Sequence, residues 1–280
     1  MEQFDLVILG GGPAGTHAAS AAAKNGLKTA LVEADALGGT CLNRGCIPTK
    51  TLLHTAELCR EARTGAEIGL VAPEVSVDMA ALQTYKNGVV EKLAAGIEQG
   101  LQKAKVTLLR GSARLLSPTE VEVNGEVLKT KRVLIATGSL PARIPVPGSD
   151  LPGVYDSTGM LALETIPERV VIVGGGVIGA EFASLYADLG SRVTVIEALD
   201  RLLANMDREL GQSLKMSLKK RGADIHTSAS LKEIRQDGGE LVCVFAENEQ
   251  ELEARGDAVL IAVGRKPNTA GLFAPGCEPE

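Results

Sequence analysis

The sequence has no tryptophan, few other aromatic residues and no excess of positive charge. Its 280 residues include three tyrosines and four phenylalanines, and 29 Lys and Arg face 35 Asp and Glu for a formal net charge of −6. Proteins that bind nucleic acid use aromatic stacking platforms or basic surface tracks. We therefore expect no nucleic-acid partner.

The sequence also lacks a long apolar run. The apolar stretch at 170–187 is interrupted by Gly174–Gly176 and Glu181, whereas a membrane-spanning helix needs roughly 18 uninterrupted apolar residues. The N-terminus carries Glu2 and Asp5 where a secretory signal carries positive charge. These features predict a cytoplasmic protein without a membrane partner.

Cysteines are few and odd in number, which argues against a secreted disulfide framework. The five lie at positions 41, 46, 59, 243 and 277. Only Cys41 and Cys46 are close in sequence, and they point to redox chemistry or a metal. Zinc is disfavoured because no second cysteine pair exists and His54 lies eight residues beyond Cys46. We expect no metal site and incidental roles for the other three thiols.

Glycine is abundant: 32 of the 280 residues, or about 11%, are glycine, against an average of about 7%. The length of the chain suits two domains. Apolar, β-branched runs predict strands at 5–9, 29–33, 106–109, 132–136, 170–173, 192–197 and 258–263. Segments of helical period predict helices at 13–25, 41–60, 79–103, 177–189 and 207–220. This alternation predicts the α/β class with parallel sheets covered by helices. Antiparallel ribbons at 121–128, around Asn124-Gly125, and at 241–254 add a small β meander to each half.

The two halves repeat on either side of a proline-rich connection at 141–152. Gly10-Gly11-Gly12-Pro13-Ala14-Gly15 corresponds to Gly174-Gly175-Gly176-Val177-Ile178-Gly179. Glu33 lies 23 residues after Gly10, and Glu197 lies 23 residues after Gly174. The repeated spacing predicts two nucleotide-binding units of the same fold.

Each glycine motif follows a predicted strand and opens a predicted helix, as in Rossmann dinucleotide sites. The first glycine permits the tight turn, the second lets a pyrophosphate approach the backbone, and the third lets the helix pack on the strand. The helix N-terminus favours the anion, and the glutamate accepts hydrogen bonds from a ribose diol. Glu197 would repel a 2′-phosphate, so NAD is favoured over NADP, and Arg201 is interpreted as a solvated surface charge.

The cysteine pair lies within residues 38–50, a few residues after Glu33. A regular helix would separate residues five apart by about 7.5 Å along its axis, too far for a disulfide. Gly45 and Pro48 indicate a distorted start of the helix, in which the two thiols can form a reducible disulfide. A zinc site and two inert buried thiols are the alternatives.

Five motifs together resemble the FAD-dependent pyridine nucleotide–disulfide oxidoreductases. They are GGGPAG at 10–15, GGTCLNRGCIPTK at 38–50, ATG at 136–138, GGGVIGAE at 174–181 and AVGRKPN at 262–268. The resemblance covers nearly all of this chain, and it corresponds to the N-terminal portion of the family's members. The cysteine motif is most similar to that of members that oxidise dihydrolipoamide with NAD⁺, and mercuric and glutathione reductases use close variants. Arg44 departs from the small apolar residue common at its position.

The resemblance implies which residues form the sites. FAD would be held by Gly10, Gly12, Gly15, Glu33, Thr40, Lys50, Ser112, Ala113, Ala136, Thr137 and Gly138. NAD would be held by Gly174, Gly176, Gly179, Glu197 and Gly264. The catalytic residues would be Cys41, which exchanges with the dithiol substrate, Cys46, which faces the flavin, and the pair Lys50 and Glu181 beside it.

The resemblance further implies an enzyme that oxidises a small-molecule or lipoyl-domain dithiol through a Cys41–Cys46 disulfide and FAD. Full-length members are homodimers that serve 2-oxo acid dehydrogenase or glycine cleavage complexes. Residues 1–145 would form an incomplete FAD-binding domain, 146–270 the NAD-binding domain, and 271–280 the start of a return to the FAD domain. We expect the 280-residue chain to bind FAD weakly or not at all and to turn over poorly. The alternative to a disulfide reductase is a non-catalytic nucleotide-binding module.

Overall fold

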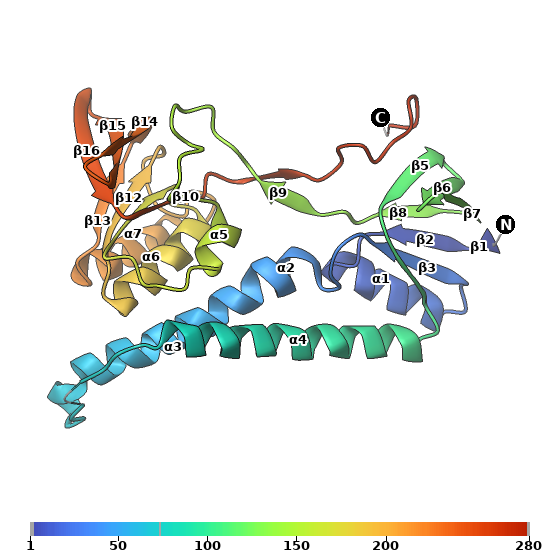
Figure 1. Ribbon diagram of the computed structural model, residues 1–280, viewed down its shortest axis with the longest axis horizontal. Coiled ribbons are helices and arrows are strands. Elements are labelled where there is room, and N and C mark those ends of the chain that lie inside the picture. The colour runs from blue at the N-terminus through green and yellow to red at the C-terminus, as the bar shows by residue number, and fades with distance from the viewer. Residues whose placement is uncertain (1–2, 73, 279–280) are drawn as a thin grey trace. The chain divides into compact units, whose positions relative to one another are not determined.

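The computed structural model describes residues 3–72 and 74–278, which fold into two compact α/β units (Figure 1). The first unit comprises Met1–Pro48, Asn87–Leu140 and Lys266–Glu280. The second comprises Thr49–Lys86 and Pro141–Arg265. The α/β class is thus confirmed, while the functional boundaries at 145 and 270 stay predictions. None of the described helices is long and apolar enough to cross a membrane.

The first unit has three layers around a parallel sheet of order β4-β3-β2-β8. These strands are Thr107–Arg110, Thr29–Glu33, Leu6–Leu9 and Val133–Ile135. Ile8 and Leu31 pack on the helical side, which holds α1 (Pro13–Lys24) and α4 (Met79–Lys103). Their neighbours Val7 and Val32 pack on the opposite side. Alternate residues of each strand therefore build the two cores, as a buried parallel sheet requires.

The opposite side of this sheet is covered by a small second sheet of order β1-β7-β6-β5. Its strands are Gln3–Phe4, Glu126–Thr130, Glu120–Val123 and Ala113–Ser117. Asn124 and Gly125 join β6 to β7 with φ values of 51° and 86°. Two consecutive positive φ angles are the mark of a type I′ turn, so the hairpin expected at 121–128 is confirmed.

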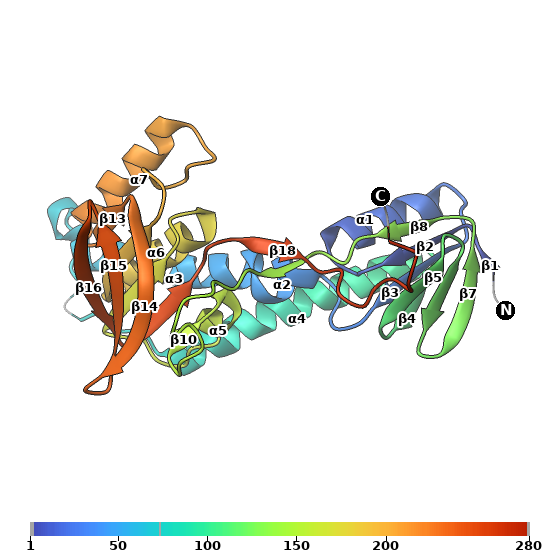
Figure 2. The same ribbon diagram turned by 90° about the horizontal axis from the view of Figure 1, so that it is seen from above.

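The second unit repeats the plan around a parallel sheet of order β10-β17-β11-β12-β13. Its strands are Val154–Tyr155, Ala258–Ile261, Arg169–Val173, Arg192–Glu197 and Asp224–Thr227. One face packs on helices α3 (Cys46–Thr64), α5 (Ser157–Leu161), α6 (Val177–Leu189) and α7 (Arg208–Lys220), and α3 is followed by the 3-10 helix η1 (Gly65–Ile68). The other face packs on the antiparallel sheet β14-β15-β16, seen side by side in Figure 2 (Ala229–Asp237, Glu240–Glu247, Gln250–Gly256). Strands β9 (Ser139–Pro141) and β18 (Arg265–Pro267) form a separate two-stranded sheet.

The helix expected at 41–60 differs from the structure. It begins earlier, as α2 (Gly39–Arg44), breaks at Gly45 and continues as α3 to Thr64. Gly45 has φ −150° and ψ −115°, outside the helical region. A Cβ atom there would lie 2.9 Å from the carbonyl oxygen of Thr40, so the break depends on glycine. The distortion inferred from Gly45 is confirmed, and it separates the two cysteines into two helices.

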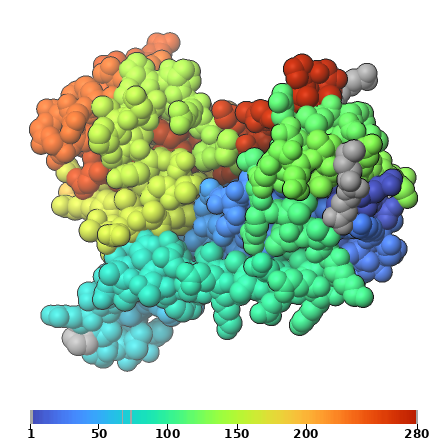
Figure 3. All heavy atoms as spheres, turned by 45° about the vertical axis from the view of Figure 1, so that its right-hand side comes forward, coloured from blue at the N-terminus to red at the C-terminus, as the bar shows by residue number. Residues whose placement is uncertain are grey.

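The two parallel sheets differ in how well one equivalent strand is covered. All four residues of β17 are buried in the second unit, whereas Leu134 and Ile135 of β8 are each 37% exposed in the first. The spheres of helix α4 are visible at the surface in Figure 3, and in the first unit this helix leaves Leu93 exposed. The first unit therefore buries less apolar surface at β8 than the second does at β17.

The third glycine of each motif should be the least tolerant of substitution. A Cβ atom at Gly15 would lie 1.8 Å from the carbonyl oxygen of Gly10, and one at Gly179 would lie 1.9 Å from that of Gly174. We expect Gly15→Ala and Gly179→Ala each to lower the free energy of unfolding by about 3 kcal/mol or more, measured by urea denaturation. Gly176→Ala is the control, since no atom lies within 4 Å of its Cβ position. It should cost about 1 kcal/mol or less, and an equal loss in the control would contradict the steric reason.

Candidate dinucleotide and disulfide sites

The two glycine motifs fold into nearly identical turns. Gly10 and Gly174 have φ values of 108° and 111°, which only glycine adopts without strain. Their N–H groups donate to Val32 O and Ile196 O, both at 2.8 Å. The duplication inferred from the sequence is therefore present in the backbone geometry.

The first glycine of each turn also lies against the strand on its other side. A Cβ atom at Gly10 would lie 2.3 Å from Ala136 O, and one at Gly174 would lie 2.5 Å from Ala262 O. These contacts bring the segment 136–138 to the first turn and the segment 262–264 to the second. The family resemblance assigns residues 136–138 to FAD and Gly264 to NAD.

The second glycine of each motif, in contrast, borders open space. Gly12 and Gly176 are the N-cap residues of α1 and α6, with ψ −176° in both. The nearest atom to a Cβ at Gly12 would be Gly39 Cα at 3.7 Å, and none lies within 4 Å at Gly176. A helix N-terminus with open backbone beside it suits a phosphate group. Both turns therefore fit the pyrophosphate of a dinucleotide.

Each terminal glutamate is held in the same way. Glu33 accepts hydrogen bonds from the N–H groups of Gly11 at 2.6 Å and Asp35 at 2.7 Å. Glu197, which is buried, accepts them from Gly175 and from Leu199. Each carboxylate oxygen keeps a further lone pair that can accept a hydroxyl hydrogen bond. The glutamates can thus hold their turns and receive a ribose diol.

Arg201 is bound to its own turn rather than freely solvated. Its Nη2 donates to Ala204 O at 2.8 Å, and its Nη1 lies 3.3 Å from the Asp200 carboxylate. Because the guanidinium already makes these two contacts, they do not favour a role for Arg201 in binding a 2′-phosphate. The preference for NAD consequently rests on Glu197.

The two cysteines lie at the junction of α2 and α3. Cys41 is half-buried within α2, and Cys46 is exposed as the first residue of α3. A Cβ atom at Gly45 would lie 3.5 Å from Cys41 Cα, so the chain turns back on Cys41 just before Cys46. The N-terminal end of the 19-residue α3 would stabilise a negative charge on the Cys46 sulfur.

Asn43 stabilises this junction and was not among the residues predicted from the sequence. Its Nδ2 donates to the carbonyl oxygens of Leu37 and Gly39, both at 3.0 Å, and to Ala36 O at 3.4 Å. Arg44 next to it pairs with the Asp35 carboxylate. The only sequence signal was an amide side chain between two cysteines, beside glycines that need their carbonyl groups satisfied.

The structure brings Lys50 and Glu181 together within the second unit. Lys50 Nζ lies 2.8 Å from Glu181 Oε1, and the side chains are 60% and 28% exposed. Apart from Lys50, the residues assigned to FAD lie in the first unit, and those assigned to NAD lie in the second. Asn268 Nδ2 donates to Thr137 O at 3.3 Å, and Asn268 N–H donates to Gly138 O at 3.0 Å. The ligand roles of all these residues stay predictions.

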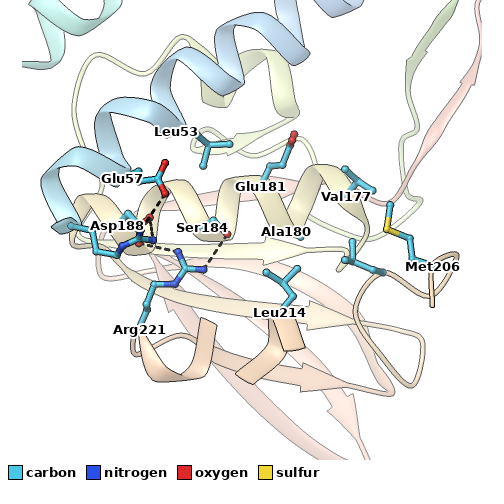
Figure 4. Close-up of a pocket in the computed structure, with 12 residues that line it drawn as sticks. Leu53, Glu57, Val177, Ala180, Glu181, Ser184, Asp188, Met206, Leu214 and Arg221 are labelled. Carbon is cyan, nitrogen blue, oxygen red and sulfur yellow. Dashed lines mark hydrogen bonds and ion pairs between the residues drawn. The ribbon is translucent and has the colours of Figure 1, made fainter. Parts of the chain in front are cut away.

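A cavity of about 420 Å³ lies over α6 in the second unit (Figure 4). Leu53, Val177, Ala180, Met206 and Leu214 form its apolar walls. Asp188 and Arg221 lie together at one end, and Glu181 lies farther along α6 in the direction of Val177 (Figure 4). Across residues 3–72 and 74–278, no group of three or more His, Cys, Asp or Glu side chains is arranged to hold a metal.

Comparison with protein families matches residues 4–279 to the family described as Pyridine nucleotide-disulphide oxidoreductase. Among curated proteins, the chain is 42% identical over 277 residues to a dihydrolipoyl dehydrogenase of Thermus scotoductus, covering 97% of the chain and 59% of that protein. It is 40% identical over 275 residues to one of Chlamydia pneumoniae, covering 97% and 58%. The chain thus spans about three fifths of the length of these relatives.

Among solved structures, the chain is similar to the HOCl-induced flavoprotein disulfide reductase RclA of Escherichia coli, in a Cu(II) complex. The TM-score is 0.83 at 34% identity, over 97% of this chain and 59% of that one. Over the matched residues this flavoprotein disulfide reductase shares the α/β fold of the chain.

The reactivity of the thiols should follow their burial. Burial raises the pKa of Cys243 to about 12, so very little of it is thiolate near neutral pH. In the reduced, folded chain at about pH 8, we expect a maleimide to modify the exposed Cys46 rapidly and Cys243 only after unfolding. Mass spectrometry of timed samples measures both rates, with the urea-unfolded chain as the control. Equal rates at Cys46 and Cys243 in the folded chain would contradict the placement of Cys46 at the surface and of Cys243 in the core.

Proposed function

Because the chain belongs to the pyridine nucleotide-disulphide oxidoreductase family, we propose that it forms the dinucleotide-binding part of an NAD-dependent dihydrolipoyl dehydrogenase. The single observation that carries the proposal is the duplicated turn with an open second glycine, at Gly12 and Gly176. FAD and NAD are the cofactors of this family, and each turn fits one pyrophosphate. The identity of 38–42% to proteins named dihydrolipoyl dehydrogenase supports the substrate class.

In this proposal, residues 1–145 hold FAD and residues 146–270 hold NAD. Gly10, Gly12, Gly15 and Glu33 would bind the ADP half of FAD, with Thr40, Ser112, Ala113 and the segment 136–138 along the cofactor. Gly174, Gly176, Gly179, Glu197 and Gly264 would bind NAD. Residues 271–280 would begin the return to the FAD domain.

The chemistry of the chain itself is thiol–disulfide exchange between Cys41 and a dithiol. A substrate thiolate attacks Cys41 Sγ, the Cys41–Cys46 bond breaks, and Cys46 leaves as a thiolate. The second substrate thiol, losing its proton, attacks the substrate sulfur of the mixed disulfide and releases the Cys41 thiolate with a cyclic disulfide product. The substrate loses two electrons, and the cysteine pair gains them. When bound, FAD would supply the two-electron chemistry that links the reduced cysteine pair to NAD⁺.

Two features of the chain support these roles. The N-terminal end of α3 favours negative charge at Cys46, which makes Cys46 the better leaving group of the pair. Lys50 lies one helical turn later on α3 and is paired with Glu181. We propose that Glu181 holds the Lys50 ammonium, whose charge favours a thiolate and an electron-rich flavin.

Partners are proposed from the relatives. A lipoyl-bearing dithiol would be the substrate, and a 2-oxo acid dehydrogenase or glycine cleavage complex would supply it. The homodimer and the cytoplasmic location stay predictions from the sequence. Another disulfide reductase of the family is the second candidate, since the solved structure at 34% identity is an HOCl-induced reductase. A non-catalytic nucleotide-binding module is the third.

Alanine at the open glycine of each turn should separate the two cofactor sites. Neither Gly12→Ala nor Gly176→Ala creates a contact closer than 3.7 Å, so both variants should fold. Each new methyl group would occupy the space proposed for a pyrophosphate. We expect Gly12→Ala to weaken FAD binding and Gly176→Ala to weaken NADH binding, each by about tenfold or more, in fluorescence titrations.

Each variant is the control for the other cofactor. Gly12→Ala should retain NADH affinity, and Gly176→Ala should retain FAD affinity. Because we expect FAD to bind weakly, the titration should extend to high FAD concentration. Loss of both cofactors in one correctly folded variant, or no NADH binding by the unmutated chain, would overturn the assignment of the turns.

The roles of the two cysteines can be separated spectroscopically in the flavin-loaded chain. A thiolate in contact with flavin gives a broad long-wavelength absorbance band after reduction by two electrons. In the unmutated chain the band should require this reduction, because it opens the disulfide and leaves the flavin oxidised. Cys41→Ser has no disulfide to reduce and should show the band before any reductant is added, whereas Cys46→Ser should lack it, because only Cys46 is proposed to face the flavin. A band that survives in Cys46→Ser and disappears in Cys41→Ser would reverse the two roles. Absence of the band in the unmutated, flavin-loaded chain would favour the non-catalytic module.

A further inference from the structure

Three charged side chains meet at one end of the cavity on α6, within the second unit: one from α3, one from α6 and one from the residue that follows α7. Asp188 Oδ2 of α6 lies 3.1 Å from Arg60 Nη1 of α3, and Asp188 Oδ1 lies 2.9 Å from Arg221 Nη1, the residue after α7. The Asp188 side chain is only 4% exposed. Figure 4 shows Asp188 and Arg221 joined at this end, with Glu181 farther along the same helix. We refer to Asp188, Arg60 and Arg221 as the Asp188 junction.

The position of Asp188 is unfavourable for α6 alone. It lies in the last turn of the helix, which ends at Leu189 and is capped by Gly190 with φ 104°. A carboxylate there faces the negative end of the helix dipole, and its burial removes hydration. The two guanidinium groups offset these costs, and Arg63 of α3 donates to Asp188 O at 3.2 Å. Asp188 is therefore explained by the link it makes to α3 and to the end of α7.

The second ionic link between α3 and α6 is the exposed one. Lys50 and Glu181 lie 2.8 Å apart with side chains 60% and 28% exposed, and an exposed pair shifts an equilibrium by roughly fivefold at most. Between the two links the cavity opens where Leu53 of α3 faces Ala180 of α6. The exposed pair is too weak to determine by itself where α3 lies on α6.

We propose that Asp188 is a positioning residue that fixes α3 on α6 and thereby aligns Lys50 with Glu181. Glu181, Ser184 and Asp188 follow one another at helical spacings of three and four, so one face of α6 carries both links. Arg221 adds a hydrogen bond from its Nη2 to Ser184 Oγ at 3.4 Å on that face. The flavin-directed role of Lys50 rests on the proposed function, whereas the alignment itself does not.

The alignment can be measured through the chemical reactivity of the Lys50 amine. An amine-reactive acetylating reagent is applied to the 280-residue chain without cofactors, well below its unfolding temperature, and acetylation of Lys50 is followed by mass spectrometry. Glu181→Gln should raise the Lys50 rate by about twofold to fivefold, since it removes the partner charge. Asp188→Asn should raise it by a similar factor, and the double variant should raise it no further. Asp188→Glu should restore the slow rate, because the adjacent cavity can accept one methylene.

Two further variants test whether the effect on Lys50 is specific to the Asp188 junction. Asp237→Asn makes the same chemical change in a carboxylate that also pairs with two arginines, Arg235 and Arg255, on the β14–β16 sheet. It should leave the Lys50 rate unchanged. Arg60→Gln removes only the α3 side of the junction and should raise the Lys50 rate even if Asp188→Asn fails to fold.

A purely structural Asp188 predicts a different result. Asp188→Asn would then melt at a lower temperature while Lys50 in the folded chain kept its unmutated rate, and that result would overturn the proposal. An unchanged Lys50 rate in Glu181→Gln would overturn it as well. Because no FAD or NADH is present, a failure of cofactor binding in the titrations above leaves this measurement intact, and the two failures can be told apart.

Discussion

Both glycine turns depend on one backbone contact, in which the third glycine of a motif lies against the carbonyl oxygen of the first. A Cβ atom at Gly15 or Gly179 would come within 1.9 Å of that oxygen. Because α1 and α6 pass so close to the preceding turn, they begin directly at the carboxyl ends of β2 and β11. The open second glycine and the glutamate bound to the turn take their positions from that start. A side chain at the third position would displace the helix and the ligand site with it.

Local sequence was sufficient to predict features that local physical chemistry determines. The alternation of strands and helices, the duplicated turns and the Asn124-Gly125 hairpin follow from periodicity and from positions that need positive φ. The break between α2 and α3 could only be suspected, because it depends on how closely Gly45 approaches Thr40 O. Asp188 gave no signal, since its partners Arg60 and Arg221 are 128 and 33 residues away. Capping rules place carboxylates at the start of a helix, not at its end.

The two units have the same glycine turn, and in each a later residue donates a hydrogen bond to the second residue of that turn. The two units take different courses after this residue. Gly38 N–H donates to Gly11 O in the first unit, and Leu203 N–H donates to Gly175 O in the second. Gly38 and Leu203 both have positive φ angles, 98° and 50°, in the left-handed region of the backbone. Gly38 becomes the N-cap of the helix that carries Cys41. Leu203 accepts a strain of about 1–2 kcal/mol and lines the cavity on α6 before the chain enters α7. After this shared hydrogen bond, the chain continues into the cysteine-bearing helix α2 in the first unit and toward α7 in the second.

Burial decides which charges on α3 hold structure and which stay available to a ligand. The Lys50 side chain is 60% exposed, so another charge can approach it from solvent. The Asp188 carboxylate is 4% exposed, and losing it would leave two guanidinium groups without their shared partner. Removing one member of a buried ionic group costs far more than removing one member of an exposed pair. Helix α3 therefore begins at an exposed cysteine and is held on α6 by a buried ionic contact near its other end.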